Sequence, residues 1–307
     1  MILAMAPTAC TREAVPAPEP PADPGALWFG GDVHFGVSAR SGLSDIAPSL
    51  AGAVGIVNLE GPLTREGRSF GEAPGGATWE GSRIVLTNPT DAPAKLYELG
   101  VRAVSTANNH RMDAGVAGAS RTAGALEHAG LLSLSDVPEF RPIGAARSTF
   151  LAYDLENPAV PDQLARALDE AAKHQPSLRV VSLHVTGPAS YLPRPELLVA
   201  VEAAVFHGAD IVVAHGTHVI GPVERRGSTV IAWGLGNLFF DCECTAEDEA
   251  LILRVSLAPG HPAQVIPIRA GLGGRDASLH ANPAGVFDLL EGLGSSPLTR
   301  VGQGAEF

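Results

Sequence analysis

The feature that most constrains this chain is a repeated pattern in which a short apolar run ends in a cluster of polar residues. Ala26 to Phe29 leads into Gly30-Gly31-Asp32-Val33-His34, and the β-branched run from Ala53 to Val57 leads into Asn58-Leu59-Glu60. Short apolar runs bounded by glycine and polar residues are typical of buried strands. At each place we therefore predict a strand followed by a loop.

The same pattern returns along the rest of the chain. Apolar runs at 99–105, 179–183, 209–214 and 229–233 lead into Asn108-Asn109-His110, His184, His215-Gly216-Thr217-His218 and Gly234-Leu235-Gly236-Asn237, respectively. Between these runs, residues 116–129 and 194–207 have helical spacing, and Gly130 is placed to end the first helix. Strands that alternate with helices favour a layered α/β core, in which polar residues just past the strand ends build sites.

We predict one catalytic domain over residues 26–275, because the motifs extend from position 32 to position 241. Residues 1–25 are expected to be a signal remnant or a disordered linker, and residues 276–307 a C-terminal extension. Within that extension, 286–293 has the composition of a terminal helix, and the last ten residues are expected to be poorly ordered.

The polar clusters have the chemistry of a metal site. Five of the ten histidines lie at the ends of four separate strand-like runs, together with two carboxylates and an asparagine amide. Asp32 and His34 alternate by two, so both side chains would point to one side of an extended segment. A donor set of nitrogen and oxygen without thiolate favours Mn, Fe or Zn. The predicted metal ligands are Asp32, His34, Glu60, Asn109, His184, His215 and His218.

His110 belongs to the same polar cluster, and Asp113 follows it closely. Asp113, three residues after His110, is placed either to orient the imidazole by accepting its second ring hydrogen or to cap the helix that follows. The sequence favours neither role over the other.

At these residues the chain resembles the capsule synthesis protein CapA family, also called the poly-γ-glutamate capsule biosynthesis family, of the calcineurin-like metallophosphoesterase superfamily. The resemblance covers roughly residues 27 to 270. The motifs that carry it are Gly31-Asp32-Val33-His34, Asn58-Leu59-Glu60-Gly61-Pro62-Leu63-Thr64, Ala107-Asn108-Asn109-His110 with Asp113 and Gly115, Ser182-Leu183-His184, His215-Gly216-Thr217-His218-Val219 and Leu235-Gly236-Asn237-Leu238-Phe239. The resemblance implies an α/β fold, a layered metallophosphoesterase-like β-sandwich flanked by helices.

The resemblance also implies roles for single residues. Asp32 and His34 would bind one divalent metal ion, and Asn109 and His184 a second one. His110 would stabilise the transition state or protonate the leaving group, which makes His110 and Asp113 the predicted catalytic pair.

Two positions depart from the superfamily pattern. Glu60 stands where most superfamily enzymes have a bridging aspartate. The superfamily usually closes with Gly-His-x-His, which would put a histidine at position 216, whereas this chain has His215-Gly216-Thr217-His218. His218 matches the terminal histidine of that motif, and His215 is a candidate ligand in a shifted register.

The resemblance implies hydrolysis of a phosphate monoester or diester by a dinuclear centre. The alternatives are a non-catalytic accessory factor in the synthesis, export or anchoring of an anionic polymer such as poly-γ-glutamate, and amide-bond chemistry on such a polymer. A net charge of −12 argues against a nucleic-acid footprint or binding to an anionic membrane face. Bound divalent metals would supply the local positive charge that an anionic substrate needs.

Cys10 follows a short apolar run and precedes a segment rich in proline, alanine and acidic residues, which resembles the end of a lipoprotein signal and its linker. Cys10 is therefore a candidate lipidation site, which would anchor the chain to a membrane at the cell envelope or outside the cytoplasm. The alternative is a disordered N-terminus on a cytoplasmic protein. Cys242 and Cys244, one residue apart, are expected to be buried or free thiols, with a redox or metal role as the alternative.

Overall fold

The computed structural model describes residues 25–36, 42–43, 45–65, 78–80, 83–143, 146–242, 245, 247–258 and 260–307. The candidate lipidation site Cys10, the expected linker up to residue 24 and Cys244 lie outside these ranges. Cys242 is buried and disulfide-bonded, so the expectation of a free thiol at this position is wrong.

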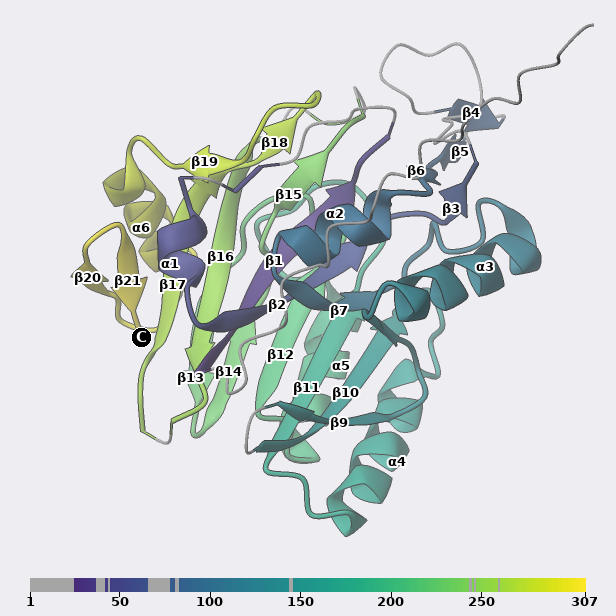
Figure 1. Cartoon of the computed structure of the whole chain (residues 1–307). Coiled ribbons are helices and arrows are strands. Elements are labelled where there is room, and N and C mark those ends of the chain that lie inside the picture. Colours follow the sequence, from purple (N-terminus) through teal and green to yellow (C-terminus); the bar gives the residue numbers. More distant parts are fainter. Residues whose placement is uncertain are drawn as a thin grey trace, which may run out of the picture.

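Two sheets form the centre of the described part of the chain (Figure 1). The 11-stranded sheet has the order β20 (Thr299–Val301), β21 (Gly304–Glu306), β17 (Ala263–Arg269), β16 (Glu249–Ser256), β1 (Ala26–His34), β2 (Ala53–Leu59), β7 (Val101–Ser105) and β8 (Leu132–Leu134), with β15 (Asn237–Phe240), β18 (Gly271–Leu272) and β19 (Ser278–Leu279) beside this path. The six-stranded sheet has the order β13 (Val223–Arg226), β14 (Thr229–Ala232), β12 (Ile211–His215), β11 (Leu178–His184), β10 (Ala146–Asp154) and β9 (Glu139–Ile143). Two short pairs, β3 (Leu63–Thr64) with β6 (Asn88–Pro89) and β4 (Thr78–Glu80) with β5 (Arg83–Val85), stand apart.

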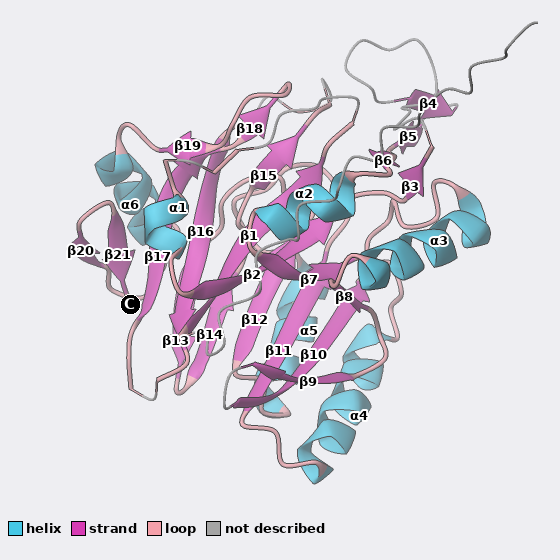
Figure 2. Ribbon diagram, viewed as in Figure 1, coloured by secondary structure: helices cyan, strands magenta, loops and turns pink. Residues whose placement is uncertain are grey.

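The two sheets pack face to face, and helices cover their outer faces (Figure 2). Side chains alternate along β1: Leu27 and Phe29 lie in the core between the sheets, opposite Phe150 of β10, whereas Trp28 faces the helices. The helices on the larger sheet are α1 (Ala47–Leu50), α2 (Ala92–Glu98) and α3 (Gly115–His128). Those on the smaller sheet are α4 (Val160–Lys173) and α5 (Pro195–Phe206), and α6 (Pro283–Gly292) contributes to the core between the sheets. The predicted α/β β-sandwich flanked by helices is confirmed.

Most of the central strands run parallel. β1, β2, β7 and β8 pair in parallel in the larger sheet, and β10, β11, β12 and β14 do so in the smaller one. The carboxyl ends of parallel strands meet at one edge of a sheet, and this edge is where such folds place their sites. The fold therefore brings the polar residues that follow these strands to a common edge.

Gly30 and Gly31, predicted to lie in a loop, are instead inside β1, which continues to His34. The pairing of β1 with β2 shifts register between Phe29 and Asp32, as at a β-bulge. A Cβ on Gly31 would lie 1.9 Å from the Gly236 carbonyl oxygen, so this close approach of two backbones requires glycine.

The last ten residues are ordered into strands, so the expectation of a poorly ordered end is wrong. β20 and β21 form a hairpin whose second strand pairs with β17. Residues 276–307 thus add β19, α6, β20 and β21 to the sandwich. Among the described helices, none has the length and apolar character needed to cross a membrane.

Candidate metal centre

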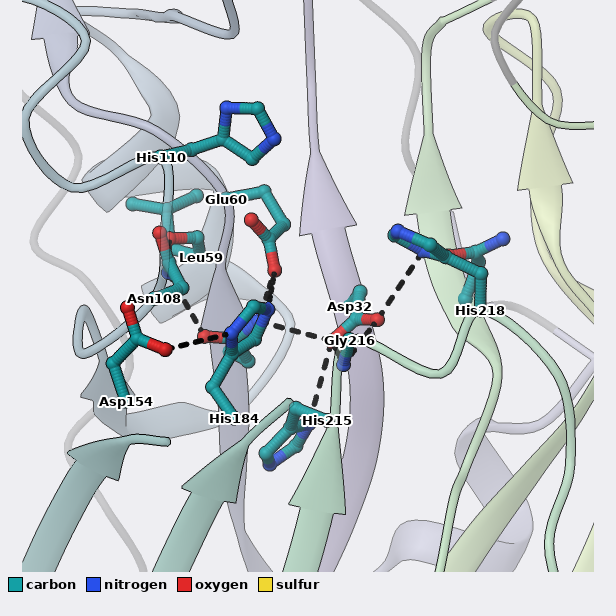
Figure 3. A network of polar contacts seen from close by, with 12 residues as sticks. Asp32, Leu59, Glu60, Asn108, His110, Asp154, His184, His215, Gly216 and His218 are labelled. Atoms are coloured by element: carbon teal, nitrogen blue, oxygen red, sulfur yellow. Dashed lines mark hydrogen bonds and ion pairs between the residues drawn. The ribbon is translucent and has the colours of Figure 1, made fainter. Parts of the chain in front are cut away.

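The predicted ligands converge at the carboxyl-end edge of the two sheets. Figure 3 shows Asp32 between His215 and His218, and His184 between Glu60 and Asp154. The larger sheet contributes the carboxylates of Asp32 and Glu60, and the smaller sheet contributes the imidazoles of His184 and His215.

Asp32 is the most heavily contacted carboxylate of this edge. It is completely buried, and its two oxygens lie 3.5 Å from His215 Nδ1 and 3.4 Å from His218 Nδ1. The backbone N–H of Gly216 donates to the same carboxylate, at 3.0 Å from Oδ2. In the sheet, Asp32 pairs with Asn237 on one side and with Asn58 on the other. Because two neighbouring strands and a loop hold Asp32, its carboxylate has little freedom to move.

Asn58 links the two carboxylates. Its side-chain N–H group donates to Asp32 Oδ1 at 2.9 Å and to Glu60 Oε1 at 2.6 Å. Asn108 in turn donates to Asn58 Oδ1 at 3.0 Å and to the Leu59 carbonyl at 2.8 Å. This amide relay keeps two buried anions side by side and compensates part of the cost of burying them.

Glu60 and His184 form a buried ion pair. Glu60 Oε1 lies 3.0 Å from His184 Nε2, and the other ring nitrogen lies 3.6 Å from Asp154 Oδ1. Burial opposes the charge on Glu60, but the positive charge and hydrogen bond of His184 outweigh it and lower the Glu60 pKa to about 2. Burial likewise opposes the charge on His184, but Glu60 and Asp154 outweigh it and raise the His184 pKa to about 10. The raised pKa keeps a proton on His184 in the metal-free protein.

His34 is buried and neutral. Burial lowers its pKa to about 4, against the hydrogen bond to the Thr87 carbonyl, which would raise it. That bond, 3.1 Å long, requires Nε2 to carry the hydrogen, because a carbonyl oxygen only accepts. The tautomer leaves the lone pair on Nδ1, which is the form in which histidine binds a metal ion.

The presence of glycine at position 216, where the superfamily pattern has a histidine, has a structural cause. Gly216 has a left-handed φ of 78°, and an added Cβ would lie 2.3 Å from the Val185 carbonyl oxygen and 2.5 Å from His184 Nε2. A histidine side chain therefore does not fit at this position, and His215, one residue earlier, reaches Asp32 instead. His218 also has a left-handed φ, 55°, and its Nδ1 lies 3.0 Å from Asn237 Oδ1. Such strain in a residue with a side chain is typical of functional sites.

His110 Nδ1 lies 2.6 Å from Asp113 Oδ2, the contact that an orienting role requires. The same carboxylate accepts the backbone N–H of Leu86 at 2.7 Å. The other role considered, capping of α3, is wrong: the N-cap residue is Ala114, and no side chain caps the helix.

A cavity of about 410 Å³ opens over this edge. Asn109, His110, His184 and His218 line it, so a ligand in the cavity touches residues from both sheets. Phe240, another lining residue, has its ring tilted against the ring of the buried His34, with centroids 5.5 Å apart.

The residue types at this edge and the distances between them suit the binding of divalent metal ions. Two ligands of one tetrahedral ion, each bound at about 2.1 Å, stand about 3.4 Å apart. The separations of Asp32 from His215 and His218, and of Glu60 from His184, are 3.0 to 3.5 Å. Several buried nitrogen and oxygen atoms here have no hydrogen-bond partner among the described residues: Glu60 Oε2, Asn108 Oδ1, His184 Nδ1 and His215 Nδ1. Within the described ranges, however, no three His, Cys, Asp or Glu side chains already surround a single point as a ligand set.

Comparison with known families identifies the chain. The model of the family "Bacterial capsule synthesis protein PGA_cap" matches residues 13–135 and 136–242, which is more than half of the chain. The chain belongs to this family. The predicted family is thereby confirmed.

Two curated relatives carry the names of the same family. The "PGA biosynthesis protein CapA" of Bacillus subtilis (strain 168) is 27% identical over 64% of this chain and 55% of its own length. The "Capsule biosynthesis protein CapA" of Bacillus anthracis is 26% identical over 60% of this chain and 52% of its own length. The chain thus spans about half the length of the curated relatives that it matches. A hypothetical protein from Thermus thermophilus superposes with a TM-score of 0.47 and 16% identity, over 79% of this chain and 97% of that one.

The motifs that carry the family resemblance contain all of the predicted ligands but do not cover the whole site. Asp154 was missed, although it follows the apolar end of β10 just as His184 follows β11. Asn58, Asn108 and Asn237 were part of the recognised motifs, but no role was predicted for them. Their role, to hold Asp32, Glu60 and His218 in place, depends on contacts between distant parts of the chain.

Proposed function

We propose that this chain is a metal-dependent phosphoesterase that hydrolyses a phosphate monoester or diester with two divalent ions. The observation that carries the proposal is the convergence of the buried Asp32, Glu60, His184 and His215 with the half-buried His218, at separations that suit ligands of a shared ion. Carboxylates and imidazoles packed this closely without a thiolate favour Mn, Fe or Zn.

The assignment of the ligands to two ions follows what the family resemblance implies. Asp32 and His34, with His218, would hold the first ion, and Asn109 and His184 the second. Glu60 pairs with His184 and is linked to Asp32 through Asn58, and His215 contacts Asp32. When bound, such ions supply a nucleophilic water and polarise the phosphoryl group.

The chain's own residues provide the proton transfer. With Nδ1 held by Asp113, His110 has Nε2 left to donate a proton to the leaving oxygen of an ester in the cavity that it lines. Because Asp113 also accepts the Leu86 N–H, the orientation of the imidazole is fixed before a substrate arrives.

The test is turnover of bis(p-nitrophenyl) phosphate and of p-nitrophenyl phosphate by the metal-depleted protein, before and after addition of Mn²⁺ or Zn²⁺. We expect metal-dependent turnover that Asp32→Ala and His110→Ala abolish. The matched control is His207→Ala, because His207 pairs with Asp169 at 2.7 Å on the surface, outside the site. Wild-type turnover that neither site variant lowers contradicts the proposal.

A second candidate function is that of an accessory factor for an anionic polymer. Family membership favours it, since both curated relatives are named as capsule or PGA biosynthesis proteins. In this case the metals would bind carboxylates of a polymer such as poly-γ-glutamate at the cell envelope, without bond cleavage. Metal-dependent retention of poly-γ-glutamate by the protein, with no turnover of either ester, would favour this function over hydrolysis.

A further inference from the structure

Asn237 is a completely buried residue at the same edge and is absent from the predicted ligand set. It is the first residue of β15, where it pairs in register with Asp32 of the parallel strand β1. Both side chains reach one atom of a third residue, because His218 Nδ1 lies 3.0 Å from Asn237 Oδ1 and 3.4 Å from Asp32 Oδ2. The imidazole nitrogen therefore faces two oxygens, one from each of two neighbouring strands.

The contacts of Asn237 fix which end of its amide faces His218. Its Nδ2 donates to the Glu247 carbonyl oxygen at 3.2 Å, so Oδ1 is the end directed at the imidazole. If the two ends were exchanged, the amide oxygen would lie against a carbonyl oxygen, and neither atom can donate. The strand thus presents a carbonyl oxygen beside Asp32, which is the kind of donor that Asn109 is predicted to supply.

The imidazole of His218 is held in place from two directions. Its backbone has a left-handed φ of 55°, which is costly for a residue with a side chain and persists only where the surroundings impose it. The ring lies edge-on to that of Phe240, with centroids 5.1 Å apart and an angle of 73° between the planes. Phe240 and Asn237 belong to the same strand, so β15 sets the position of the ring at two points.

A nitrogen that faces two oxygens at these distances suits a hydrogen in the metal-free protein and a cation in the loaded one. Because an amide oxygen only accepts, Nδ1 of His218 carries the ring hydrogen when no ion is bound. The same separations are close to the value of about 3.4 Å expected for two ligands of one tetrahedral ion. Two oxygens and an imidazole nitrogen are a donor set that suits Mn, Fe or Zn.

We propose that Asn237 Oδ1 is a further ligand of the first ion, beside Asp32 Oδ2 and His218 Nδ1. The inference rests on the metal centre of the proposed function, but not on ester hydrolysis. When the ion binds at Nδ1, the ring hydrogen of His218 moves to Nε2. If Asn237 only positions His218, the hydrogen stays on Nδ1, and Nε2 is the nitrogen left for the ion.

The place of this hydrogen is measured in the wild-type chain by two-bond ¹H–¹⁵N spectra of the histidine rings, before and after addition of Zn²⁺. The His218 signals are assigned by their absence from His218→Gln. We expect the hydrogen on Nδ1 in the metal-free protein and on Nε2 in the loaded one. This result without turnover of either ester leaves the inference standing and removes the hydrolase alone. A hydrogen that stays on Nδ1 in the loaded protein, or a protein that takes up no Zn²⁺, overturns the inference.

The Zn²⁺ affinity of two variants measures what the oxygen contributes. Asn237→Leu is similar in size but has no oxygen, and it should weaken binding by about 100-fold or more, since loss of a partner outside the ligand set already costs about 10- to 100-fold. Asn237→Asp keeps an oxygen and adds a negative charge, so it should bind at least as tightly as the wild type. The matched control is Asn282→Asp at the N-cap of α6, which should leave the affinity unchanged. Wild-type affinity in folded Asn237→Leu overturns the inference.

Discussion

The layer between the sheets and the polar edge above it are built from the same strands, but burial has opposite effects on stability in the two regions. Val180 of β11 and Phe150 of β10 lie in the apolar core between the sheets, whereas the same two strands end in His184 and Asp154. In the layer each side chain gains by being buried. At the edge, buried charges and buried polar atoms without a hydrogen-bond partner destabilise the folded state. The difference indicates that the layer stabilises the fold and that the edge is kept for function.

The largest effect that we expect is on the stability that the apolar layer provides. Phe150→Ala should lower the free energy of unfolding by about 3–5 kcal/mol, because it removes a buried ring and leaves a cavity. Urea denaturation measures this loss. Metal content per folded molecule should stay at the wild-type value, and a loss of metal from the folded variant would show that layer and edge are not separate.

The Glu60→Gln variant tests how much the buried ion pair at the edge contributes to stability in the absence of metal. Removing one partner of a buried ion pair leaves the His184 charge facing only the more distant Asp154, so we expect destabilisation of about 3 kcal/mol in urea. Adding His184→Gln to this variant should recover part of the loss, since the unpaired charge is then removed. A double variant less stable than Glu60→Gln would contradict the account of the pair.

Metal addition should stabilise the wild type. At a free metal concentration about 100 times Kd, binding to the folded state contributes about 2.7 kcal/mol, which appears as a rise in Tm. Asp32→Ala should show no such rise. An equal rise in both proteins would place the bound metal elsewhere.

The smallest expected effect concerns the residue that orients His110. Asp113→Asn should reduce turnover about 10- to 100-fold with little change in metal content, as expected for a partner outside the ligand set. Asp169→Asn, which alters the comparable surface pair with His207, is the matched control and should leave turnover unchanged. A reduction of the same size in both variants would exclude a specific role for Asp113.

The sequence predicted the parts of the molecule that combine an apolar run with a polar end. β11, β12, α3 and α5 lie within a residue or two of the predicted ranges, and Gly130, with a φ of 80°, follows α3 as predicted. These elements were predictable because burial and backbone geometry act over a few neighbouring residues.

Features that depend on distant partners were not predictable in the same way. The hairpin of β20 and β21 is ordered by pairing with β17, and composition alone does not show this pairing. The exclusion of a side chain from Gly216 depends on His184, which lies 32 residues earlier in the chain. Asp154 is different, because its strand carried the predictive pattern and the signal was overlooked.

Metal content of the purified full chain, measured by inductively coupled plasma mass spectrometry, tests the central claim most directly. The protein is stripped with a chelator, reloaded with Mn²⁺ or Zn²⁺ and freed of excess ion, beside Asp32→Ala and His207→Ala treated in the same way. The account predicts two divalent ions per chain in the wild type and in His207→Ala, and the loss of at least one ion in Asp32→Ala. Equal metal content in the wild type and Asp32→Ala, at any value, would contradict it.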